Sequence, residues 1–100
     1  MPVKMIQSSQ FNRGWEAGME YMIGTLLVIR PKQSWAAYVS NSSGDHVRIV
    51  RGTAVLPDGE FLKVGEPLPR QLVVGEKIAY VPTRDEHGRL RAKVWRPVEW

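Results

Sequence analysis

The sequence contains no cysteine, only two histidines and no long apolar run. Without cysteine, neither a disulfide framework nor thiolate chemistry is available, and His46 and His87 alone are too few soft ligands for a structural zinc site. The most apolar stretch, residues 22–29, is interrupted by Gly24 and ends at Arg30, well short of the ~18 residues that a membrane-spanning helix needs. We therefore expect a protein without a metal site or a transmembrane helix, in the reducing cytoplasm.

Recognisable catalytic constellations are also missing. Asp85 and Glu86 are adjacent in a predicted turn, a solvated setting unsuited to a general acid. Ser42, Asp45 and His46 lie within one loop, where residues so close in sequence rarely reach the geometry of a catalytic triad. The sequence predicts a protein that is not an enzyme and uses no cofactor. A hydrolase or transferase is a third hypothesis that no constellation supports.

The charge balance is basic. Fourteen lysines and arginines stand against ten aspartates and glutamates, which gives a formal net charge of +4. A basic surface favours polyanionic partners, nucleic acid among them, without identifying one.

The first 21 residues differ from the rest and are predicted to form an N-terminal extension. Trp15, Met19 and Met22 follow a helical spacing of i, i+4 and i+7, but Gly14 and Gly18 each cost a helix about 1 kcal/mol relative to alanine. Two interpretations stay open: a flexible tail, or a short amphipathic helix docked on an apolar surface.

From Met22 onward, short β-branched runs alternate with turn residues, a pattern typical of a small all-β barrel or sandwich. A long connection, residues 52–75, contains a hairpin predicted around Pro57-Asp58-Gly59. In the last strand, alternation predicts Leu90, Ala92 and Val94 on the inner face and Arg89, Arg91, Lys93 and Trp95 on a basic outer face. The five predicted strands are 22–30, 34–40, 46–51, 76–82 and 89–96, and the predicted core is Leu26, Val39, Val47, Ile49, Ile78, Tyr80, Leu90 and Val94.

The run from Gly24 to Val39 resembles the opening of cold-shock domains: a glycine-led strand, a short turn with proline and lysine, then an aromatic second strand. Residues 44–49, 72–80 and 88–97 are similar to the third, fourth and closing strands of that family. The resemblance covers residues 22–98. It implies a five-stranded antiparallel OB-fold barrel in a domain of residues 22–100, and binding of single-stranded RNA or DNA on a row of aromatic side chains.

The sequence departs from the family where the aromatic row should be. Only Trp35 stands at one of these aromatic positions, while Val28, Ala37 and Arg48 occupy others. Any nucleic-acid affinity should therefore depend more on phosphate contacts than on stacking. The predicted site comprises Arg30, Lys32, Trp35, Arg48 and Arg51, with Arg91 and Lys93 from the last strand.

Three alternatives accompany this prediction. Trp35 is equally interpretable as a core aromatic, and the cluster of Arg84, Arg89, Arg91, Lys93 and Arg96 as the solvated face of a terminal strand. The rival function is a protein-interaction or oligomerisation module. Its apolar patch of Val28, Ala37 and Val50 would be covered by the N-terminal extension, a second copy or another protein.

Overall fold

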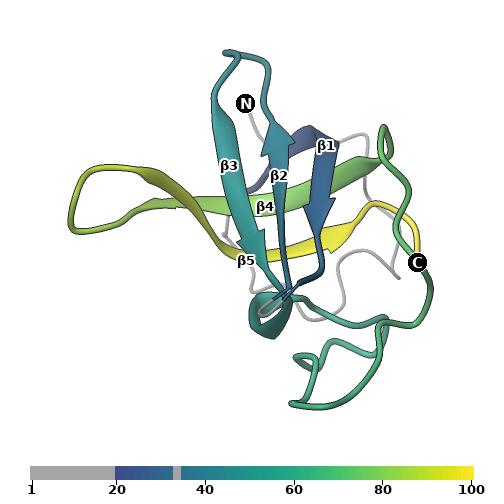
Figure 1. Ribbon diagram of the computed structural model, residues 1–100. Coiled ribbons are helices and arrows are strands. Elements are labelled where there is room, and N and C mark those ends of the chain that lie inside the picture. The colour runs from purple at the N-terminus through teal and green to yellow at the C-terminus, as the bar shows by residue number, and fades with distance from the viewer. Residues whose placement is uncertain (1–19, 33–34) are drawn as a thin grey trace.

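The computed structural model describes residues 20–32 and 35–100, and these fold as one five-stranded barrel (Figure 1). Its elements are β1 (Met22–Arg30), β2 (Ala36–Ser40), β3 (His46–Val50), the 3₁₀ helix η1 (Arg51–Thr53), β4 (Lys77–Arg84) and β5 (Leu90–Pro97). All five predicted strands are present, so the all-β, OB-fold-like architecture is confirmed. The N-terminal extension, interpreted as a flexible tail or a short docked helix, lies outside the described residues as far as residue 19, and Met22, the last member of the helical spacing, begins β1 instead.

The strands close the barrel in the order β1-β2-β3-β5-β4, with β4 returning to pair with β1. Every pair is antiparallel except β3 with β5, which run parallel where Arg48 lies opposite Arg91. Figure 1 shows the β4–β5 hairpin crossing the β1–β2–β3 sheet and extending beyond β3. The parallel contact is therefore where this hairpin seals the barrel.

Most of the residues that alternation predicts for the barrel interior are buried there. Six of the eight predicted core side chains are fully buried: Leu26, Val39, Val47, Ile49, Ile78 and Tyr80. The other two, Leu90 and Val94, are half-buried. Both belong to β5, where the alternation changes.

A β-bulge in β5 inverts its alternation. Val81 pairs with Val94 but Pro82 pairs with Ala92, so Lys93 is the extra residue. After the bulge, Trp95 is the residue that points into the barrel, and it is completely buried. The prediction that Trp95 lies on the outer basic face is therefore wrong.

Gly24 allows β1 and β2 to approach closely. A methyl group at this position would collide with the Val39 side chain and lie 2.7 Å from the Ser40 carbonyl oxygen. Because the obstacle is partly backbone, it cannot move aside cheaply.

We expect Gly24→Ala to lower the free energy of unfolding by about 1–3 kcal/mol, the usual cost of overpacking. Urea denaturation followed by circular dichroism measures this difference. Gly52→Ala is the matched control, because nothing lies within 4 Å of the added methyl group there. Equal stability of the two variants would contradict the close approach.

The long connection after β3 closes one end of the barrel. It begins with η1 and contains the predicted hairpin, in which Val55 pairs with Phe61 and the Gly59 N–H donates to the Leu56 carbonyl. Gly59 has φ +90°, a conformation that favours glycine at this turn position. Figure 1 shows the connection extending below the strands.

No helix in the described part of the chain is long and apolar enough to cross a membrane.

Candidate nucleic-acid interface

One row of side chains crosses the outer face of four strands. Strand pairing places Val28 of β1 opposite Tyr38 of β2, Tyr38 opposite Arg48 of β3, and Arg48 opposite Arg91 of β5. Directly opposed side chains are within contact distance of one another, with Cβ atoms ~5 Å apart. The row, named here the outer row, therefore holds an aromatic ring between an apolar and a cationic neighbour.

The two arginines of the outer row differ in their partners. No hydrogen bond or ion pair with another described residue occupies the half-buried Arg48 guanidinium. Arg91 instead lies 3.4 Å from an Asp85 carboxylate oxygen. An ion pair in contact with solvent, as this one is, contributes little to stability. Of these two arginines, Arg48 is thus the one more readily available to a phosphate.

The other predicted basic residues of this sheet lie at one end of it. Arg30 is exposed at the end of β1, and Lys32 is exposed in the following turn. Arg51 begins η1 next to the end of β3, where its Nη1 lies 3.4 Å from the Lys63 carbonyl oxygen. Together with Arg48 they give this face a positive charge.

Trp35 does not stand on the outer face. Its half-buried ring packs against the core and stacks on Trp95, with ring centroids 5.7 Å apart and planes 6° apart. Ala37, two residues later, is completely buried, as is Val39. The expected patch of Val28, Ala37 and Val50 therefore loses its central member, and Trp35 lies at the barrel end instead of at the centre of the basic face.

Tyr38 is the outer-face aromatic that the sequence prediction missed. The signal for it is the predicted burial of Val39: adjacent residues of a strand point to opposite faces, so a buried Val39 places Tyr38 outside. The same argument puts Trp35 and Ala37 inside.

The β4–β5 hairpin carries only part of the predicted basic cluster on its surface. Lys93 is exposed at the bulge, whereas Arg96 is only 1 % exposed, so Arg96 cannot belong to a surface stripe. At the hairpin turn, Asp85 accepts hydrogen bonds from the backbone N–H groups of Arg89 and His87. These bonds and the nearby arginines hold the pKa of Asp85 below its ordinary value, which makes it an anchor of the turn.

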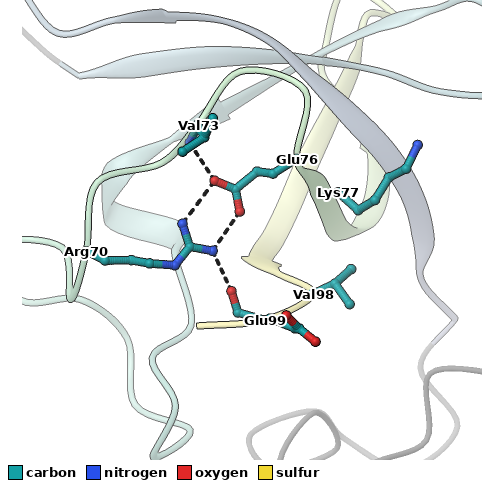
Figure 2. A pocket seen from close by; sticks show the side chains of 6 residues that line it. All are labelled: Arg70, Val73, Glu76, Lys77, Val98 and Glu99. Atoms are coloured by element: carbon teal, nitrogen blue, oxygen red, sulfur yellow. Dashed lines mark hydrogen bonds and ion pairs between the residues drawn. The ribbon is translucent and has the colours of Figure 1, made fainter.

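A charged pocket of about 360 Å³ lies beside the start of β4 (Figure 2). The Arg70 guanidinium binds both carboxylate oxygens of Glu76 and the carbonyl oxygens of Glu99 and Trp100. The Val73 N–H donates to the same carboxylate. These groups satisfy one another, so the cluster ties the connection to the chain end.

Within the described residues, no three histidine, aspartate or glutamate side chains gather as a metal site requires. His46 and His87 are both exposed, at the start of β3 and in the β4–β5 turn.

Comparison with protein-family models, with curated proteins and with solved structures finds no match to this chain.

Proposed function

We propose that this protein is a non-enzymatic, single-stranded nucleic-acid-binding protein that uses the outer face of β1, β2 and β3. The observation that carries the proposal is the pairing of Tyr38 with Arg48, an outward aromatic ring beside a guanidinium that has no carboxylate partner in the described part of the chain. A ring of this kind stacks on an unpaired base, and a guanidinium binds phosphate through two hydrogen bonds.

Single strands suit this face better than duplexes. Stacking on Tyr38 needs a base whose flat face is open, and base pairs inside a duplex cover theirs. Arg30, Lys32 and Arg51 extend the positive charge from Arg48 toward one end of the sheet, so a strand would run in that direction.

The resemblance of residues 22–98 to cold-shock domains belongs to the same proposal. In that family single strands bind on this type of sheet face, here with Tyr38 in place of a full aromatic row. A basic, cysteine-free chain is compatible with nucleic acid in the cytoplasm, which we propose as its location.

Fluorescence anisotropy with labelled single-stranded DNA and RNA, at 50 and 200 mM salt, tests the proposal. With three to four phosphate contacts, the affinity should fall about 20- to 50-fold between these concentrations, because counterions are released on binding. Absence of binding to both strands at 50 mM salt would overturn it. Equal affinity for a duplex would show that stacking of an unpaired base on Tyr38 does not contribute to binding.

A second function, protein interaction, is favoured by an exposed apolar patch. The β1 bulge leaves Leu27 and Val28 exposed, and Val73 and Val74 are exposed in the loop that binds β1 through the Gly75 N–H and the Leu26 carbonyl. A second copy or another protein would cover such a patch. A mass that rises with concentration in sedimentation, and that Val74→Lys returns to a monomer, would support this function.

A further inference from the structure

An open pocket of about 450 Å³ lies at the barrel end where β1 finishes. Its apolar lining comes from Ile29 and Pro31 and from Leu68 and Leu72 of the long connection. Trp35 contributes its ring, and Arg70 and Gln71 complete the lining. We name it the Trp35 pocket. Its volume lies within the range of small-molecule sites, which are apolar with a few polar groups.

The Trp35 ring is held in place from one side. It stacks on Trp95, whose own indole N–H donates to the Val50 carbonyl at 2.7 Å and which is completely buried. A ring supported in this way loses little freedom when a second flat group packs against it.

The indole N–H of Trp35 has no acceptor among the residues that the structure describes. Of the three tryptophans in the described ranges, Trp95 donates to Val50 and Trp100 to Val55, whereas no hydrogen bond is formed by Trp35. The pocket thus offers an unused donor at the edge of a flat aromatic ring.

The polar lining selects a neutral ligand. The Arg70 guanidinium donates to the Glu76 carboxylate and to three backbone carbonyls, so its hydrogen-bond donors are occupied and its charge is already compensated. The Gln71 side-chain amide, which offers both a donor and an acceptor, forms no hydrogen bond with any residue of ranges 20–32 and 35–100. A planar heteroaromatic ring with hydrogen-bonding edges suits these groups better than an anion does.

Cations stand at the rim of the Trp35 pocket. Arg30 lies between the lining residues Ile29 and Pro31, and Lys32 follows them; both are exposed, and neither forms an ion pair with a described residue. A base in the pocket would carry its sugar-phosphate toward these side chains. Arg30 also borders the outer face, because it pairs with Ala36 beside Val50.

We infer that the Trp35 pocket takes one unstacked base of the single strand bound on the outer face, an inference that rests on the proposed function. Trp35 would then contact a single base at the barrel end, and not as a member of an aromatic row on the outer face. The strand would run from Tyr38 and Arg48 past Arg30 into the pocket.

Filling the pocket tests the inference. Gln71→Trp places a large side chain at an exposed position of the lining without altering the core, and Val64→Trp adds the same group at a fully exposed position elsewhere. Each protein is titrated with a six-nucleotide single strand and with six versions that carry one abasic site each. So short a strand cannot shift register without losing contacts.

In the unmodified protein, two of the six abasic sites should weaken binding by about 5- to 150-fold, one for the base on Tyr38 and one for the base in the pocket. In Gln71→Trp, the abasic site at the pocket position should no longer weaken binding, while the one at the Tyr38 position still should. In Val64→Trp, both abasic sites should weaken binding as in the unmodified protein. An unchanged abasic profile in Gln71→Trp overturns the inference while the proposed function stands. If no protein binds any strand, the proposed function fails as well.

Nuclear magnetic resonance supplies a direct readout. Adding uridine or adenosine monophosphate should shift the Trp35 indole N–H signal, assigned with Trp35→Phe, and leave that of Trp95 in place. A shift produced by a proline-rich peptide but by neither nucleotide would assign the pocket to a protein ligand and overturn the inference.

Discussion

Arg70→Met is expected to lower the free energy of unfolding by about 2–4 kcal/mol. The guanidinium joins Glu76 to the carbonyl oxygens of Glu99 and Trp100, and each hydrogen bond to a charged group is worth about 1.5–3 kcal/mol. The sum is reduced because the Arg70 side chain is 33 % exposed. Besides Arg70, Figure 2 shows only the Val73 N–H bound to the Glu76 carboxylate, so methionine would leave the carboxylate with that one donor among the residues drawn.

The control is Arg84→Met. Arg84 is exposed, and within the described ranges its guanidinium donates only to the Gly88 carbonyl of its own turn, so Arg84→Met should cost much less than Arg70→Met. Urea denaturation of both variants at pH 7 gives the comparison. Equal losses would show that the Arg70 cluster contributes nothing special to stability.

The same cluster predicts how stability depends on pH. Burial alone would raise the pKa of Glu76, but its hydrogen bonds with Arg70 and Val73, together with the Arg70 charge, outweigh this and hold the pKa below 4.5. The cluster therefore stabilises the fold fully above pH 4.5, and this stabilisation is lost as the pH falls through the depressed pKa. Arg70→Met should raise the Glu76 pKa and flatten that dependence.

The sequence predicted the strands well because turn residues and alternation are local signals. Pro57-Asp58-Gly59 and the glycines near the turns mark where strands stop, and burial of Val47 and Ile49 follows from simple period-two alternation. These features need no knowledge of distant parts of the chain.

The wrong or missing predictions concern two kinds of position. At one kind, strand pairing accommodates an extra residue; at the other, contacts between distant segments determine which residues meet. Nothing local in β5 signals that Lys93 is an extra residue, and this one insertion moves Trp95 from the outer face to the core. Likewise, the Arg70 cluster joins residues up to 30 positions apart in sequence. Pairing of β5 with β4 determines the position of Trp95, and docking of the long connection brings the Arg70 cluster together.

The site prediction was limited in a different way. Arg30, Lys32, Arg48 and Arg51 do lie on one sheet and its edge, but a binding role for Trp35 on the outer face conflicts with the predicted burial of Val39. Residues 35, 37 and 39 share a face in any regular strand. A buried Val39 therefore predicts Tyr38 on the outer face.

Tyr38→Ala should weaken binding of single-stranded nucleic acid by about 5- to 150-fold, the value of one stacked base, with no change in the salt dependence. Its ring lies on the outer face, so its removal spares the core. Circular dichroism should accordingly show an unchanged fold. The measurement is fluorescence anisotropy over at least four salt concentrations.

Arg48→Ala should act differently in the same titration. Loss of one phosphate contact should make the slope of log affinity against log salt shallower by about 0.7, whereas Arg48→Lys should retain most of the slope because the charge remains. Lys63→Ala, an exposed cation on the long connection, is the control that should change neither slope nor affinity. If Tyr38→Ala and Arg48→Ala change the slope equally, the ring and the guanidinium do not have the separate roles assigned to them. If Lys63→Ala has the same effect as Arg48→Ala, the binding reflects net charge and no defined face.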